Sequence, residues 1–137
     1  NRIRILSKPI LGWEDWIEKK PYRFRMDKKP NANDAKQPVR HFWAFIVWNV
    51  TVNKLQILEV TQKTIQQAIK ALVDNKKWGD PKGYDITITR VGEGLESEYS
   101  IMPNPHSEIS EEAKSALKAT PIDIDRLYTG EDPFEVK

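Results

Sequence analysis

The chain has 137 residues and a formal net charge of +2, a size that suits one domain with tails. It contains no cysteine, which excludes disulfides, thiolate metal sites and a cysteine nucleophile. No apolar run reaches the roughly 20 residues of a membrane-spanning helix. The lack of cysteine fits a reducing compartment, and we expect a cytoplasmic protein with no membrane contact.

Charged side chains are unevenly distributed along the chain. Residues 1–54 contain 12 Lys or Arg and 5 Asp or Glu, whereas residues 55–137 contain 10 and 15. A basic first part followed by an acidic second part indicates a polyanionic partner and an acidic tail. Chance clustering on a solvated surface would give the same pattern.

The first part of the chain predicts three strands. Asn1–Leu6 alternates arginine with isoleucine, and Tyr22–Met26 alternates aromatic residues with arginine, so each predicts a strand with a basic outer face. His41–Trp48 is apolar on both faces and rich in β-forming residues, which predicts a central strand. The polar stretch Asp27–Pro38 predicts a long loop that closes over bound ligand.

The second part predicts three more strands and a helix. Lys54–Val60 forms a hairpin with the central strand, and Tyr84–Val91 forms another with Glu98–Met102. Thr61–Asn75 carries apolar residues at helical spacing, and its N-cap is Thr64, with a capping box, or alternatively the first residue of the segment.

These elements favour a mainly β fold. Five or six short strands around one helix are compatible with a five-stranded OB-type β-barrel, and small α+β domains also fit the pattern. We expect an OB-fold nucleic-acid-binding domain over residues 1–105. Residues 106–137 are expected to form a short helix, over Ser110–Ala119, and a flexible acidic tail with too little apolar surface to fold alone.

Few residues offer chemistry for catalysis. His41 and His106 are far apart and lack metal-ligand spacing, and Gly92–Ser97 indicates a hairpin turn rather than a phosphate-binding loop. The sequence shows neither a nucleophile elbow nor a carboxylate pair with an acid–base partner. We therefore expect a protein that is not an enzyme and binds neither a cofactor nor a metal.

Aromatic residues near cations suggest single-stranded nucleic acid as the partner. The chain has five tryptophans, several of them close to Arg or Lys. Bases stack on aromatic side chains while basic groups follow the phosphates, and Arg also stacks on bases. Two or three of the tryptophans are expected in the core instead. In the central strand we expect Trp43, Phe45 and Val47 to face inward, with Trp48 near the rim.

The arginines of the two alternating strands would form one patch if those strands are neighbours. The acidic tail is expected to compete with nucleic acid for this patch, and its last residues to bind a partner protein. The predicted nucleic-acid-binding residues are Arg2, Arg4, Trp13, Trp16, Arg23, Arg25, Lys28, Lys29, Arg40, Trp48, Trp78 and Arg90, and the predicted partner-binding residues are Asp132 and Phe134.

Four stretches of the chain together resemble the single-stranded DNA-binding proteins of tailed bacteriophages. They are Arg2–Trp16, His41–Trp48, Leu55–Leu72 and Trp78–Tyr99, with WGDP, YDI.I.R.GEGL and TQ.TIQ.AI.AL as the most specific parts. The resemblance extends to about Pro105. It implies an OB fold that coats single-stranded DNA during phage replication and recombination in the bacterial cytoplasm. It also implies an acidic tail that binds replication or recombination proteins. Some relatives hold a structural zinc, but this chain lacks the cysteines for it.

Two other functions fit the residues. One is an RNA-binding OB or cold-shock-like module, which the 2′-hydroxyl would distinguish from a DNA-binding protein. The other is a protein–protein adaptor whose aromatic residues form an interface and which binds no nucleic acid.

Overall fold

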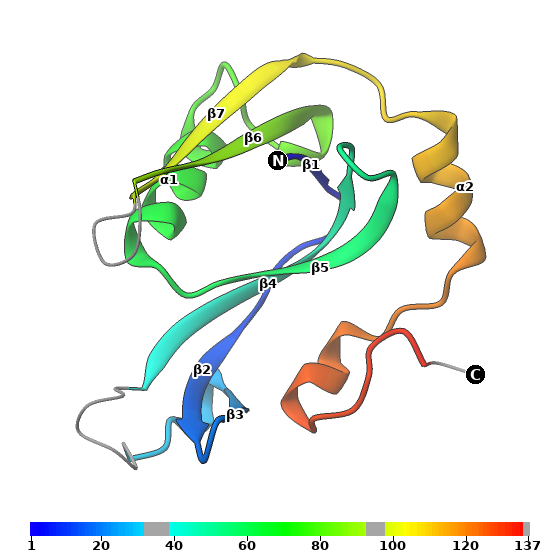
Figure 1. Ribbon diagram of the computed structural model, residues 1–137. Coiled ribbons are helices and arrows are strands. Elements are labelled where there is room, and N and C mark those ends of the chain that lie inside the picture. Colours follow the sequence, from blue (N-terminus) through cyan, green and yellow to red (C-terminus); the bar gives the residue numbers. More distant parts are fainter. Residues whose placement is uncertain (32–38, 93–97, 136–137) are drawn as a thin grey trace.

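The computed structural model describes residues 1–31, 39–92 and 98–135. Within them the chain is mainly β, with a seven-stranded antiparallel sheet and two α-helices (Figure 1). The strands are β1 (Arg2–Ile5), β2 (Ile10–Ile17), β3 (Lys20–Arg25), β4 (Arg40–Asn49), β5 (Lys54–Val60), β6 (Tyr84–Val91) and β7 (Glu98–His106); the α-helices are α1 (Lys63–Asp74) and α2 (Glu111–Ala119).

The long strand β4 organises the sheet. Along one edge it pairs first with β2 and then with β1, and along the other edge it pairs with β5. β1 and β2 therefore act as one bent strand beside β4. β1 also pairs with β6, which forms a hairpin with β7, and β2 forms a hairpin with β3. The expectation of five or six strands is corrected to seven, since β2 was not predicted.

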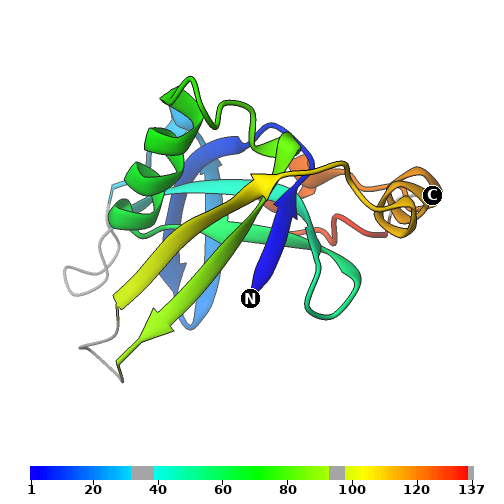
Figure 2. The ribbon, with the colours of Figure 1, turned by 90° about the horizontal axis from the view of Figure 1, so that it is seen from above.

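The main core lies between the sheet and α1. Ile65 and Ile69 of the helix form one buried cluster with Ile3 and Ile5 of β1 and with inward residues of β4, β5 and β6. Phe45 and Val47 belong to this cluster and Trp43 packs against it, so the predicted inward set of β4 is confirmed. The two helices lie at opposite ends of the sheet (Figure 2).

The opposite side of β4 is buried as well. Phe42 and Ala44 have no exposed surface, and Trp48 is only 5% exposed. The predicted position of Trp48 near the rim is wrong, because its neighbours across the strands are Arg4 of β1 and Leu55 of β5. β4 is thus a central strand covered on both faces.

Both helices form close to where the sequence predicts them. α1 begins after Gln62, whose side chain makes no capping hydrogen bond, so the predicted caps at Thr64 or Thr61 are wrong. α2 is confirmed, and the Ser110 hydroxyl accepts a hydrogen bond from the backbone N–H of Ala113.

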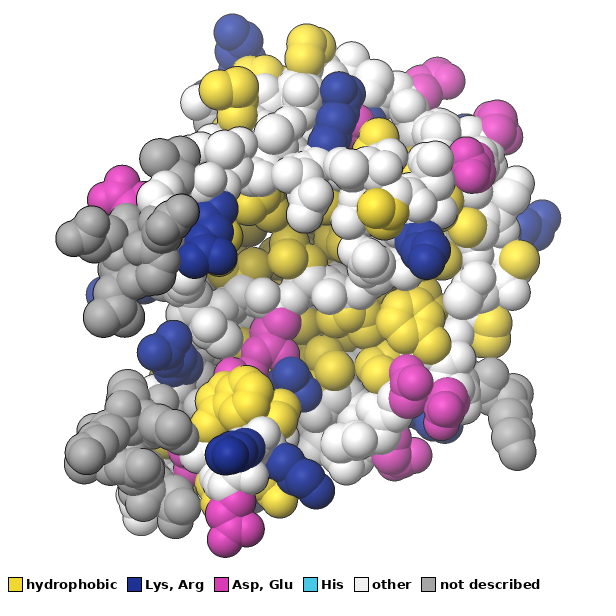
Figure 3. Space-filling view, viewed as in Figure 1, with side chains coloured by type: hydrophobic (Ala, Val, Ile, Leu, Met, Phe, Trp, Pro, Cys, Tyr) yellow, Lys and Arg dark blue, Asp and Glu magenta, His cyan; other side chains and the backbone are white. Residues whose placement is uncertain are grey.

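The described part of the sheet does not close into a barrel. β5 pairs with β4, and β7 pairs with β6, but no pairing joins β5 to β7. A small hollow of about 270 Å³ opens beside these strands, lined by residues such as Leu58, Ile88 and Tyr99. Figure 3 shows hydrophobic side chains inside a hollow between β5 and the β6–β7 hairpin.

The absence of a side chain at Gly12 lets β3 and the Phe42 ring approach the backbone of β2 closely. A Cβ at this position would lie 2.2 Å from the carbonyl oxygen of Phe24 and 2.8 Å from the Phe42 ring. We expect Gly12→Ala to lower the free energy of unfolding by about 1–3 kcal/mol, because the backbone at Phe24 would have to move to make room for the added methyl group. Urea denaturation would measure this. Gly83→Ala is the matched control, since its Cβ would meet only the His106 ring at 3.4 Å; an equal effect of both would contradict the close-approach argument.

Candidate nucleic-acid interface

Several predicted binding residues share one face of the sheet. Glu14 of β2 lies opposite Arg23 of β3 and Arg40 of β4, and side chains along a strand alternate between faces. Trp16 and Arg25 are two residues further along their strands, so they point to the same side. We call Trp16, Arg23, Arg25 and Arg40 the arginine face.

The charges of this face are partly neutralised within the protein. The Nε of Arg23 lies 2.6 Å from Oε2 of Glu59 and 3.6 Å from Oε2 of Glu14. Burial lowers the pKa of Arg23 below its ordinary value, and the nearby Glu14 carboxylate opposes that shift. Trp16 donates its indole N–H to Glu14 Oε1 at 2.6 Å, while 43% of the residue remains exposed. The face therefore offers an exposed aromatic ring beside a paired arginine.

The C-terminal segment, residues 121–135, folds back onto the arginine face. The Tyr128 ring, within the 3₁₀ turn η4 (Ile124–Tyr128), lies 6.1 Å from the Phe42 ring, and the Arg25 guanidinium lies 4.4 Å from its centre. The Tyr128 hydroxyl donates a hydrogen bond to the Leu11 carbonyl. Partial burial raises the pKa of this hydroxyl, and the nearby Arg25 opposes the shift.

This arrangement corrects the expected free tail. The segment has little apolar surface of its own, but Phe42 and the strands beneath it supply the remainder of a small apolar contact. The described residues of the segment therefore lie against the sheet instead of extending away from it.

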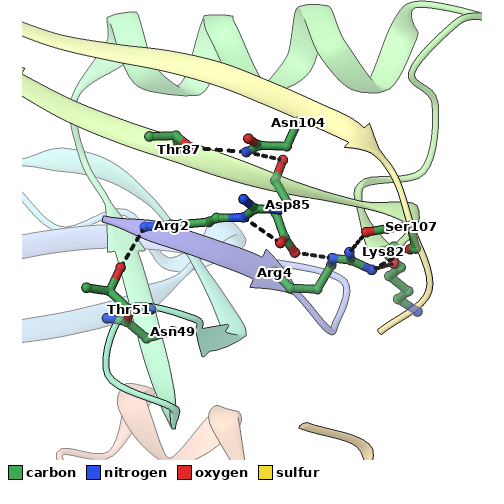
Figure 4. A network of polar contacts seen from close by, with 9 residues as sticks. All are labelled: Arg2, Arg4, Asn49, Thr51, Lys82, Asp85, Thr87, Asn104 and Ser107. Atoms are coloured by element: carbon green, nitrogen blue, oxygen red, sulfur yellow. Dashed lines mark hydrogen bonds and ion pairs between the residues drawn. The ribbon is translucent and has the colours of Figure 1, made fainter. Parts of the chain in front are cut away.

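The two predicted arginine strands are not neighbours. β2 and β4 separate β1 from β3, so the four arginines do not form one patch. Arg4 is 3% exposed and donates to Asp85 Oδ1 at 2.6 Å, to the Lys82 carbonyl and to Ser107 (Figure 4). Arg2 is more exposed and pairs with the other oxygen of the same carboxylate at 2.7 Å. Arg4 is thus a structural residue and not a nucleic-acid contact.

Two predicted stacking residues are engaged in the protein. Trp48 is buried, and Trp78 packs against the main core. The Trp78 ring stacks on His106, with 5.4 Å between ring centres and 12° between planes, and it meets Tyr84 edge-on. Neither tryptophan offers a free ring on the arginine face for a base to stack on.

Trp13 and Lys29 lie on the opposite side of the β2–β3 hairpin. Trp13 pairs across the strands with His41, and their ring centres are 5.2 Å apart. The Lys29 ammonium lies 4.5 Å from the Trp13 ring, and the indole N–H donates to the Met26 carbonyl. Lys28 is exposed in the 3₁₀ turn η1 (Met26–Lys28). Residues 32–38 of the predicted closing loop are outside the described residues.

The remaining predicted residues are exposed at the margins of the sheet. Arg40 begins β4, and Arg90 lies near the end of β6. Residues 93–97 of the predicted turn after β6 are outside the described residues. Asp132 accepts a hydrogen bond from the backbone N–H of Phe134, which is 38% exposed. Both line a hollow of about 450 Å³ between the C-terminal segment, β5 and Arg23.

The sequence did not reveal three residues that shape the arginine face. Glu14 and Glu59 hold Arg23, and Tyr128 covers Arg25. For Tyr128 a signal existed, because Ile124, Leu127 and Tyr128 have the spacing of one helical side. For the two glutamates nothing in the local sequence distinguishes them from exposed carboxylates.

Comparisons with models of protein families, with curated proteins and with solved structures find no match for this chain. Among the residues that the structure describes, no cluster of three or more His, Asp or Glu side chains could hold a metal ion. None of the helices in these ranges is both long and apolar enough to cross a membrane.

Proposed function

We propose that the chain is a sequence-independent single-stranded DNA-binding protein on an OB-type fold, acting in phage DNA replication and recombination. The observation that carries the proposal is the arginine face. There an exposed tryptophan and three arginines lie on adjacent strands, and a segment that carries negative charge covers Arg25. Base stacking on the indole and phosphate contacts from the guanidiniums are the two interactions that such binding requires.

The strand order supports the OB-type assignment. Apart from the β2–β3 hairpin, the order along the sheet is β5-β4-β1-β6-β7, and α1 connects β5 to β6. An OB fold is a partly open five-stranded barrel whose second and third strands, with adjacent loops, bind oligonucleotides. In this proposal β4 and β5 are those strands and the β2–β3 hairpin extends the loop before them.

Phage origin and the choice of DNA over RNA rest on the resemblance described above. The structure contributes a face of suitable chemistry, and a binding titration has to test whether that face binds single-stranded DNA. We expect labelled oligo-dT to bind with an affinity that falls with salt, at a log–log slope of about −0.7 per phosphate neutralised. Tighter binding of oligo-rU than of oligo-dT would favour the RNA-binding alternative, and no binding at low salt would favour the protein adaptor.

Trp16 should contribute strongly to this affinity. Stacking of a base on an aromatic ring is worth about 1–3 kcal/mol, so Trp16→Ala should weaken oligo-dT binding by about 5- to 150-fold. Fluorescence anisotropy of a labelled oligonucleotide measures this without using the protein's own tryptophan signal.

Tyr22→Ala is the matched control for that substitution. Tyr22 is 47% exposed on the same hairpin, but it points to the opposite face because Asp15 is its partner across the strands. We expect its removal to leave the affinity unchanged. If both variants bind oligo-dT like the unsubstituted chain, the arginine face is not the binding site.

A further inference from the structure

A large hollow lies on the other side of the sheet from the arginine face. It has a volume of about 670 Å³ and runs between α1, β4, the β1–β2 turn and the 3₁₀ turn η2 (Pro81–Gly83). We call it the α1 groove. Its walls include Leu11 and Val73, which are 38% and 43% exposed. A hydrophobic hollow of this size with large exposed apolar side chains is typical of a binding site.

The polar groups on the floor of the α1 groove are already satisfied by the protein. The Trp43 indole donates to His41 Nε2 at 3.1 Å, and His41 Nδ1 lies 2.8 Å from the Gly12 carbonyl. The Ser7 hydroxyl accepts from the backbone N–H of Ile46 and donates to the Lys8 carbonyl. A ligand rich in hydrogen-bonding groups would find few partners there. The floor suits apolar side chains.

Positive charge surrounds this apolar floor. Lys8, Lys70 and Lys82 line the groove against a single acidic residue, Asp80. The Asp80 carboxylate already accepts a hydrogen bond from the backbone N–H of Lys82. Lys70 is exposed and pairs with Asp74 at 2.9 Å, whereas the structure gives Lys8 and Lys82 no ion pair with any described residue. The rim therefore attracts anionic groups.

A nucleic-acid strand fits these features less well than a peptide. The Trp43 ring meets Phe45 edge-on, with 83° between the planes, and it is half-buried. The other apolar side chains of the lining are aliphatic or proline, and the His41 ring is already in contact with Trp13 and Trp43. The groove therefore lacks the open aromatic faces on which bases stack. An amphipathic segment instead places apolar side chains in a groove and its charges along the rim.

We propose that the α1 groove binds an acidic amphipathic segment of a partner protein. The apolar side chains of that segment enter between α1 and β4, and its carboxylates meet Lys8 and Lys82. This site is separate from the proposed DNA interface, so the protein could hold DNA and a partner at the same time.

The test uses the full chain and a labelled probe peptide with leucine and phenylalanine on one helical face and glutamate on the other. We expect Lys8→Glu with Lys82→Glu to weaken its binding at least tenfold, measured by fluorescence anisotropy. The matched control is Lys54→Glu with Lys118→Glu, which makes the same charge change at exposed lysines outside the groove. We expect the control to bind the probe as the unsubstituted chain does.

A second pair of variants tests the apolar walls without changing charge. Val73→Gln should weaken the probe several-fold, whereas Val52→Gln, at a residue 50% exposed and outside the groove, should not. Binding should also shift the NMR signal of the Trp43 indole N–H. A version of the peptide with lysine in place of glutamate should not bind.

Three results would overturn the proposal. The probe could bind equally to the charge-reversed and control variants, or it could shift the Tyr128 signals and leave Trp43 unchanged. Alternatively, the charge reversal at Lys8 and Lys82 could weaken oligo-dT at least tenfold while oligo-dT displaces the probe, which would assign the groove to nucleic acid. Oligo-dT binding to the unsubstituted chain tests the proposed function independently of all three.

Discussion

Removal of the C-terminal segment is expected to tighten oligo-dT binding about tenfold at low salt, within the usual range of coupling free energies. The segment places the Tyr128 ring over Arg25 and carries five acidic and two basic residues in the last seventeen of the chain. A chain truncated after Thr120 frees the guanidinium and removes the repulsion of phosphates. Because the Debye length falls from about 30 Å at 0.01 M salt to about 8 Å at 0.15 M, the gain should shrink as salt rises.

Because truncation exposes Phe42, a second variant tests the same competition in a chain of full length. Tyr128→Ala removes the contacts to Phe42 and Arg25 and the hydrogen bond to Leu11, but it keeps the acidic residues. We expect a smaller gain in affinity than for the truncation, and no gain for Val52→Ala in the exposed β4–β5 turn. If neither the truncation nor Tyr128→Ala tightens binding at low salt, the segment does not compete with DNA.

Asp85→Ala is expected to lower the stability of the chain strongly. Its carboxylate is the only acidic partner that the described residues give to Arg4, whose side chain is 3% exposed. Removing one member of a buried ion pair leaves the other charge uncompensated, which costs about 3–5 kcal/mol. Urea denaturation followed by far-ultraviolet circular dichroism should show the midpoint moving to much lower urea.

Two further measurements make this prediction specific. Asp74→Ala breaks an exposed ion pair with Lys70 on α1 and should leave the denaturation midpoint nearly unchanged. Arg4→Met combined with Asp85→Leu removes both charges, so it should be less destabilising than Asp85→Ala alone. If the loss of stability in this double variant equals the sum of the losses in Arg4→Met alone and Asp85→Leu alone, the two charges do not interact.

The sequence predicted most of the strands because their burial follows their alternation. β1, β4, β5 and β6 have clear patterns, and the structure places each within a few residues of its predicted range. β2 was missed because Glu14 and Asp15 occupy buried positions, where they are 4% and 1% exposed, so the period-two pattern is hidden. Their burial depends on β3 and β4, which a local pattern cannot reveal.

The site was predictable only in part. The alternation of side chains along a strand assigns each residue to a face of the sheet, but it does not show what covers that face. Arg25 was correctly placed on an outer face of the sheet. Arg4 also points outward from its strand, yet Ser107, 103 residues away, covers it. Tyr128 covers the opposite end of the sheet in the same way. Both covers are contacts between distant parts of the chain, and composition and spacing carry no information about them.

The position of β1 in the middle of the sheet has a consequence for how the chain folds. β1 lies between β4 and β6, and its side chains reach Asp85 and Ser107, which are 83 and 103 residues from their partners in sequence. Contacts of such long separation slow folding, because a large loop must close before they form. During synthesis, β1 cannot complete its pairing until β6 has left the ribosome. β1 precedes the six other strands of the sheet and is therefore among the last to be fully paired, whereas the β2–β3 hairpin is the earliest part of the sheet that can form from local contacts alone.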